Sequence, residues 1–188
     1  MSLRRVGYAL IVAFSLGLAS LAAHDAAADW TSEQELYVWK GRRLMVLRED
    51  DQIVRRFEIV LGVDPGDPKL YQGDNRTPEG TYFVSEKKSF SAYRRFLGLS
   101  YPNVSDAERG LYRSLISQDE WADILFANLR GVTPPWNTRL GGRIGIHGYG
   151  DRPELNVDWT QGCIAVRNDD IDYLFHRIRI GTPVHIKE

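Results

Sequence analysis

The chain has 188 residues, of which 26% are charged and 43% hydrophobic, and its formal net charge is −1 at pH 7. Lys and Arg gather in no basic stripe, so a nucleic-acid-binding protein is not expected. After an N-terminal leader, the remaining length suits one domain with a sizeable hydrophobic core.

The N-terminus has the pattern of a secretory signal peptide. Two arginines precede an uncharged, mostly apolar run over residues 6–23, and small residues with an Ala-x-Ala pattern end at Ala28. We expect export, with residues 1–28 cleaved and residues 29–188 forming one domain. The alternative is a retained membrane anchor, because the run is close to the roughly 20 residues that span a bilayer.

The next part of the chain predicts β-strands. Segments rich in β-branched, aromatic and aliphatic residues, separated by short polar turns, predict an antiparallel meander of three strands: Leu36–Trp39, Leu44–Leu47 and Ile53–Leu61. Two further strands are expected over 81–88 and 94–102. The segment 62–80 between the two groups is dense in Gly, Pro, Asp and Asn, so we expect a long loop, which in a compact domain is often functional.

Two helices are expected next, over 105–113 and 117–130. Within the second, the spacing of Trp121, Leu125 and Leu129 predicts a face that packs into the core, and Ser117 with Glu120 fits a capping box. Together with the loop over 62–80, these helices are candidates for a lid.

The last part of the chain mixes both element types. We expect a strand over 143–148, an extended stretch after Cys163, a helix over 168–178 and a closing strand over 182–188. In that helix Asn168 is the expected N-cap, followed by acidic residues in the first turn. The order predicts a β-rich α+β fold with mostly antiparallel sheets and with inserted and C-terminal helices.

The single cysteine, Cys163, shares a pattern with His147. Alternation in 143–148 turns the two isoleucines toward the core and His147 to the opposite face. After Cys163, Ile164 and Val166 are expected to face the core in the same way, which leaves Cys163 on the opposite face. An imidazole can take the proton of a neighbouring thiol and return it to a leaving group. The alternative is a buried structural cysteine with an unrelated histidine.

The residues before Cys163 suit a nucleophile turn. Gly162 lets a substrate approach closely, and the N–H groups of Gly162 and Cys163 are candidates to stabilise an oxyanion. The hydroxyl of Thr160 is expected to brace the turn by bonding nearby backbone. The histidines outside the leader show no metal-ligand spacing with the cysteine, so we expect no metal site.

The segments IHGYG and DWTQGCIAVRN resemble the active-site signature of the L,D-transpeptidase family, the YkuD-type catalytic domain of bacterial cell-wall enzymes. The matching residues are His147, Gly148, Thr160, Gly162, Cys163, Ile164 and Asn168. The segment GDNRTPEGTYFV, at 73–84, is similar to the family's loop and strand before the site. The resemblance covers roughly residues 36–188.

This resemblance implies a sandwich- or barrel-like catalytic domain that acts on peptidoglycan stem peptides in the periplasm. It implies that Cys163 attacks the carbonyl between the third and fourth residues of a stem peptide. His147 then serves as base and later as acid, oriented by the carbonyl of Gly148. A thioester forms, and an amine of another stem peptide, or water, resolves it. The resemblance implies that neither a metal nor a cofactor is required.

Other positions leave alternatives open. Tyr149, Trp159 and Arg167 flank the site and are candidate substrate contacts, although Trp159 also suits plain packing and Arg167 a solvated surface charge. Ala165 stands where many members have Arg, and Gln161 where some have His, which leaves the acceptor open. Hydrolysis, as a carboxypeptidase or amidase, is one alternative function, and a non-catalytic peptidoglycan-binding module is another.

Overall fold

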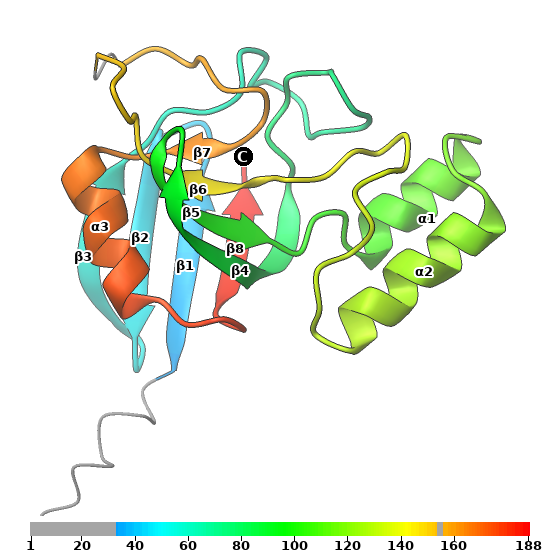
Figure 1. Ribbon diagram of the computed structural model, residues 1–188, viewed down its shortest axis with the longest axis horizontal. Helices are drawn as coiled ribbons and strands as arrows, with labels where there is room; N and C mark the ends of the chain where they lie inside the picture. The colour runs from blue at the N-terminus through cyan, green and yellow to red at the C-terminus, as the bar shows by residue number, and fades with distance from the viewer. Residues whose placement is uncertain (1–32, 154–155) are drawn as a thin grey trace, which may run out of the picture. The chain divides into compact units, whose positions relative to one another are not determined.

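The computed structural model describes residues 33–153 and 156–188, and all structural statements refer to them (Figure 1). The expected signal segment, residues 1–28, lies outside the described residues. Within the described part, no helix combines the length and the apolar character needed to cross a bilayer.

The elements follow the predicted order. They are β1 (Gln34–Trp39), β2 (Leu44–Glu49), β3 (Gln52–Glu58), β4 (Gly80–Ser91), β5 (Arg94–Leu99), α1 (Val104–Tyr112), α2 (Gln118–Leu129), β6 (Gly145–His147), β7 (Ile164–Ala165), α3 (Asn168–Arg177) and β8 (Pro183–Lys187). The β-rich α+β class is confirmed. Of the seven pairings between neighbouring strands of the described sheet, five are antiparallel.

The strands form one curled sheet in the order β3-β2-β1-β8-β4-β5-β6-β7. The predicted meander β1–β2–β3 is confirmed as an antiparallel set. Strand β8 lies between β1, to which it is parallel, and β4, to which it is antiparallel (Figure 1). Strands β6 and β7 are also parallel, and they form the edge of the sheet where the predicted site lies.

The main core lies between the sheet and α3, which packs against β5 and β6 (Figure 1). Alternate residues of the strands fill it, for example Leu36 and Val38 of β1, while Ile171 and Leu174 face it from α3. Each fully buried aliphatic side chain stabilises the fold by roughly 1.5–3 kcal/mol. This core holds the short strands β6 and β7 firmly, although each has few residues of its own.

Helices α1 and α2 pack against each other around a small hydrophobic cluster that includes Ile124. They lie away from β3 and β7, the two edge strands of the sheet (Figure 1). The capping box is confirmed: Ser117 and Glu120 exchange hydrogen bonds of 2.7 and 3.1 Å. The prediction for Leu129 is wrong, since its side chain is 72% exposed. Leu129 follows Ile124 by five residues, or about 140° around the helix, so it points away from α1.

Candidate active site

Neighbouring parallel strands carry the predicted nucleophile and base. Ile146 of β6 pairs with Ile164 of β7, and His147 pairs with Ala165. Cys163, directly before β7, therefore lies on the same face as His147. Their Cα atoms are offset by one strand spacing across the sheet and by two residues along it. The distance between the two Cα atoms is therefore about 8 Å. The two isoleucines are fully buried, which confirms the predicted alternation and anchors both functional side chains from behind.

Thr160 and Gly162 shape the turn before Cys163. The buried Thr160 hydroxyl donates to the carbonyl of Cys163 at 2.7 Å and accepts the N–H of Gly162 at 3.1 Å. Gly162 has a φ of +124°, and a Cβ there would lie 2.6 Å from the carbonyl oxygen of Arg76. Only glycine fits this turn. The N–H of Gly162 is bound to Thr160, so the N–H of Cys163 is the better candidate for an oxyanion.

His147 is held in one tautomer. Its Nδ1 lies 2.7 Å from the carbonyl oxygen of Gly148, which only accepts hydrogen bonds, so Nδ1 carries the proton and Nε2 has a free lone pair. The ring is 3% exposed and stacks on Tyr93 at 4.6 Å between centroids. Burial lowers the pKa of His147 to about 4. At neutral pH the imidazole is therefore neutral and able to accept a proton.

The thiol of Cys163 is protonated at neutral pH. Burial raises its pKa to about 11, against a smaller lowering by the backbone of Gly145 and the charge of Lys69. The sulfur donates to the carbonyl oxygen of Arg143 at 3.5 Å. With a pKa this high, the thiol needs a base to remove its proton before or during any reaction as a nucleophile.

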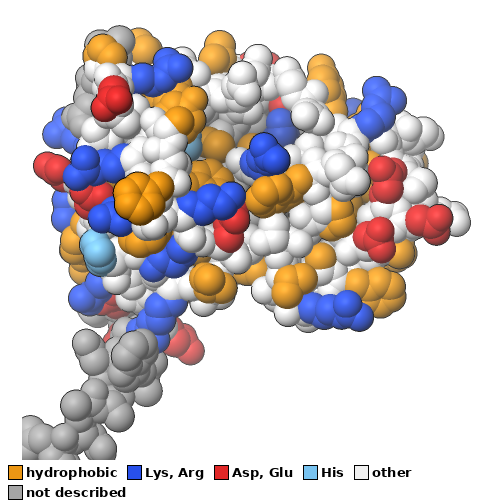
Figure 2. Space-filling model, in the orientation of Figure 1, with side chains coloured by type: hydrophobic (Ala, Val, Ile, Leu, Met, Phe, Trp, Pro, Cys, Tyr) orange, Lys and Arg blue, Asp and Glu red, His pale blue; other side chains and the backbone are white. Residues whose placement is uncertain are grey.

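A cavity of about 510 Å³ reaches Cys163. Its walls come from the loop 69–75 and the segment 141–144, with Gln161 beside the cysteine. His147 does not line it, because aromatic rings cover that side chain. Figure 2 shows the surface hollowed next to β6 and β7, with Lys and Arg side chains near the hollow.

The loop over 69–76 is ordered around one buried carboxylate. Asp74 pairs with Lys69 at 2.7 Å, and its oxygens also accept the backbone N–H groups of Leu70, Tyr71 and Arg76. Burial by itself would raise the pKa of Asp74, but the hydrogen bonds from Lys69 and the backbone lower it on balance. This loop forms one wall of the cavity, while α1 and α2 contribute no lining residue.

Asn168 is not the N-cap that we predicted. Arg167 occupies that position without a side-chain cap, and Asn168 is the first helical residue of α3. The Asn168 amide faces the segment after β6 instead: Oδ1 accepts the N–H groups of Tyr149 and Gly150, and Nδ2 donates to the carbonyl of Gly150. Asn168 therefore clamps the residues that follow Gly148, whose carbonyl holds His147.

The candidate substrate contacts separate into two groups. Trp159 lies beside His147 at 5.6 Å between ring centroids, and the buried Tyr149 packs against Trp159 at 5.7 Å. Arg167 instead pairs with Glu58 at 3.1 Å and lines a different cavity. The structure brings Tyr149 and Trp159 to the histidine and leaves Arg167 apart from the Cys163 cavity.

Sequence reasoning missed three neighbours of the site. Tyr93 stacks on His147 from the turn between β4 and β5, and Arg152 lies over the ring of Trp159 at 4.7 Å. Asp158 accepts the N–H of Leu61 at 2.8 Å, which ties the site to the end of the meander. The contacts of Tyr93 and Asp158 join distant parts of the chain, so no local spacing signals them.

Comparison with known proteins gives a family match over most of the chain. The family model described as the L,D-transpeptidase catalytic domain, YkuD, matches residues 33–186. Over 47 residues, 25% of this chain and 15% of the relative, the chain is 43% identical to the probable L,D-transpeptidase ErfK/SrfK of Salmonella typhimurium, and to that of Escherichia coli.

Solved structures share the fold. The helical cell shape determining protein Pgp2 of Campylobacter jejuni is 25% identical with a TM-score of 0.54, over 84% of this chain and 48% of that one. Bd1075 of Bdellovibrio bacteriovorus is 23% identical with a TM-score of 0.55, over 83% and 48%. The chain thus spans about half the length of these solved chains.

Proposed function

The chain belongs to the YkuD family of L,D-transpeptidase catalytic domains, and on that premise we propose that it transfers acyl groups between peptidoglycan stem peptides through Cys163. The observation that carries the proposal is the pairing of a protonated, cavity-facing thiol with a neutral imidazole on the adjacent strand. Neither a metal nor a cofactor enters the steps below.

The first half-reaction forms a thioester. The sulfur of Cys163 attacks the carbonyl carbon between the third and fourth residues of the donor stem while Nε2 of His147 takes the thiol proton. The carbonyl electrons move to the oxygen, where the N–H of Cys163 stabilises the oxyanion. When the C–N bond breaks, His147 returns the proton to the departing amine. The burial that lowers the pKa of His147 favours this return of the proton.

The second half-reaction releases the enzyme. An amine of another stem peptide attacks the thioester carbonyl, His147 takes the amine proton, and the C–S bond breaks as the sulfur regains a proton. The product is a cross-link between stems. If water takes the place of the amine, the same site is a carboxypeptidase or amidase.

The remaining residues have supporting roles in this proposal. Thr160 and Gly162 hold the nucleophile turn, and the Gly148 carbonyl orients His147. Tyr149 and Trp159 shape the histidine side of the site. We place the activity in the cell envelope after export through the signal segment, with cell-wall remodelling and cell shape as its outcome.

Intact mass tests the active thiol. Incubation with a carbapenem should add one drug mass to the wild-type protein and none to Cys163→Ala. An unmodified wild-type protein would contradict the active-thiol reading and favour a non-catalytic binding module.

Product analysis separates transferase from hydrolase. Purified protein with muropeptides should yield cross-linked dimers or exchange of the terminal D-amino acid. Trimmed stems alone, at every acceptor concentration, would show that water is the acceptor.

A further inference from the structure

Arg143 occupies an unusual place beside the nucleophile. It lies two residues before the start of β6, its carbonyl oxygen accepts the thiol of Cys163 at 3.5 Å, and its exposed side chain lines the same cavity. Its φ of +56° lies in the left-handed region, which is costly for a residue with a side chain. Such a conformation persists where its surroundings hold it and is frequent at ligand-binding positions.

The cavity is positively charged. Its lining contains two cations, Lys69 and Arg143, and no Asp or Glu. Lys69 is buried and already bound to Asp74 and to the carbonyl of Tyr71. Within residues 33–153 and 156–188, no carboxylate lies at ion-pair distance from Arg143, whereas Arg167 has Glu58. Arg143 is thus the cation of this cavity that is available to a ligand.

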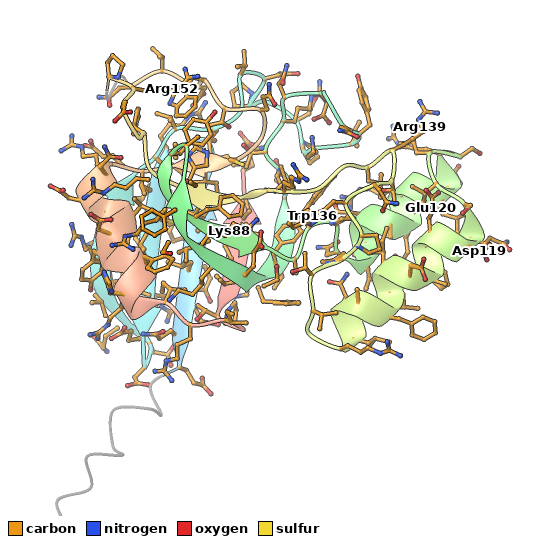
Figure 3. All side chains as sticks on the ribbon, in the orientation of Figure 1. Lys88, Asp119, Glu120, Trp136, Arg139 and Arg152 are labelled. Atoms are coloured by element: carbon orange, nitrogen blue, oxygen red, sulfur yellow. The ribbon has the colours of Figure 1, made fainter. Side chains whose placement is uncertain are left out.

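An aromatic ring supports this guanidinium. Its central carbon lies 5.5 Å from the centroid of the Trp136 ring, which Lys88 also approaches at 5.5 Å (Figure 3). Gly142 makes this packing possible, because a Cβ there would lie 2.2 Å from the ring. A guanidinium over an aromatic face keeps its N–H edge free for a planar acceptor such as a carboxylate.

We propose that Arg143 binds the C-terminal carboxylate of the D-amino acid that departs from the donor peptide. The inference rests on the proposed function, in which Cys163 attacks the carbonyl just before that residue. The carboxylate lies one residue, about 3.8 Å along the chain, beyond the attacked carbonyl. The Arg143 side chain starts beside the sulfur and is long enough to span this distance. Arginine and carboxylate can then form two parallel charge-assisted hydrogen bonds.

The test compares two synthetic donor peptides, one ending in a free carboxylate and one in a carboxamide, with a fixed acceptor amine. For the wild-type protein, kcat/KM should be about 10- to 100-fold higher with the free acid, the range expected for a hydrogen bond to a charged group. Arg143→Gln should lower kcat/KM for the acid by the same factor and leave the carboxamide unchanged. Arg143→Lys should retain part of the preference.

Arg139→Gln is the matched control. Arg139 is an exposed arginine of the same segment, it lies toward α1, and it does not line the Cys163 cavity (Figure 3). This variant should process both donors as the wild type does. Alkylation of Cys163 by iodoacetamide, a neutral reagent, should proceed equally in all variants, which shows that the fold and the thiol are intact.

Equal turnover of both donors by the wild type would overturn the role of Arg143 while leaving the proposed function standing. So would an Arg143→Gln variant that loses the same factor on both donors. If the wild-type protein turns over neither donor although its thiol is reactive, the proposed function fails, and the role of Arg143 fails with it.

Discussion

Asn168 offers a sharp test of how the histidine is positioned. Its amide makes three hydrogen bonds to the segment after β6, of 2.9 and 3.1 Å to the N–H groups of Tyr149 and Gly150 and of 2.8 Å to the carbonyl of Gly150. Asn168→Ala removes all three. At about 1 kcal/mol of net stability each, the free energy of unfolding should fall by about 3 kcal/mol.

The charge variant Asn168→Asp separates the parts of this effect. A carboxylate still accepts from Tyr149 and Gly150 but donates nothing to the carbonyl of Gly150. Its negative charge also suits the first turn of α3. The loss should therefore be smaller, about 1 kcal/mol. Asp169→Ala is the matched control, since Asp169 is an exposed neighbour on the same turn and should change stability by about 0.5 kcal/mol.

Urea unfolding followed by fluorescence measures these differences in the free energy of unfolding. The rate of carbapenem acylation measures whether His147 is still correctly placed. Because the clamp holds the residues next to Gly148, its loss should also slow acylation of Asn168→Ala by on the order of tenfold through misplacement of His147. The reasoning is refuted if Asn168→Ala stays within 1 kcal/mol of wild type, or if it acylates at the wild-type rate.

Further predictions concern the histidine and the turn. Burial lowers the pKa of His147 from 6.5 to about 4. As the pH falls, this histidine is therefore protonated in the unfolded chain before it is protonated in the folded chain. Stability should fall by about 3 kcal/mol between pH 6.5 and 4, and His147→Gln should remove that part of the pH dependence in denaturant titrations. Because burial raises the pKa of Cys163 to about 11, iodoacetamide alkylation should keep accelerating beyond pH 9. Thr160→Val should cost about 2 kcal/mol in unfolding titrations, and Thr160→Ser much less. Gly162→Ala should cost more than Thr160→Val in the same measurement, since its Cβ meets backbone.

Local patterns predicted the elements well because alternation and short turns determine them. The meander β1–β3 follows from three apolar runs with brief breaks, and the burial of Ile146 and Ile164 follows from strand alternation. The strand that carries His147 and the extended stretch after Cys163 were therefore identified correctly from the residues around them.

Local sequence patterns did not predict the long-range contacts of the site. The stacking of Tyr93 on His147 depends on where the β4–β5 turn falls in the folded sheet, which no periodicity encodes. At the start of a helix, the side chain of Asn168 can either cap the helix or bind another segment of the chain. Tertiary contacts favour the second, since the amide binds the segment after β6. Leu129 shows the same limit, because the partner of a helix determines which of its apolar residues are covered.

The position of β8 has a consequence for biosynthesis. The chain leaves the ribosome from its N-terminus, so β1–β3 and β4–β7 appear first as two separate ribbons. Strand β8 pairs with both β1 and β4 and so joins the two sets within the sheet, and a bridge between Val60 and Ala165 also joins the end of the meander to β7. The connection of β1 to β4 through β8 is therefore complete only after β8 has emerged, and a nascent chain halted before Pro183 would lack the strand between them. Completion of the sheet is in this sense a post-translational event, because β8 is the last strand in chain order.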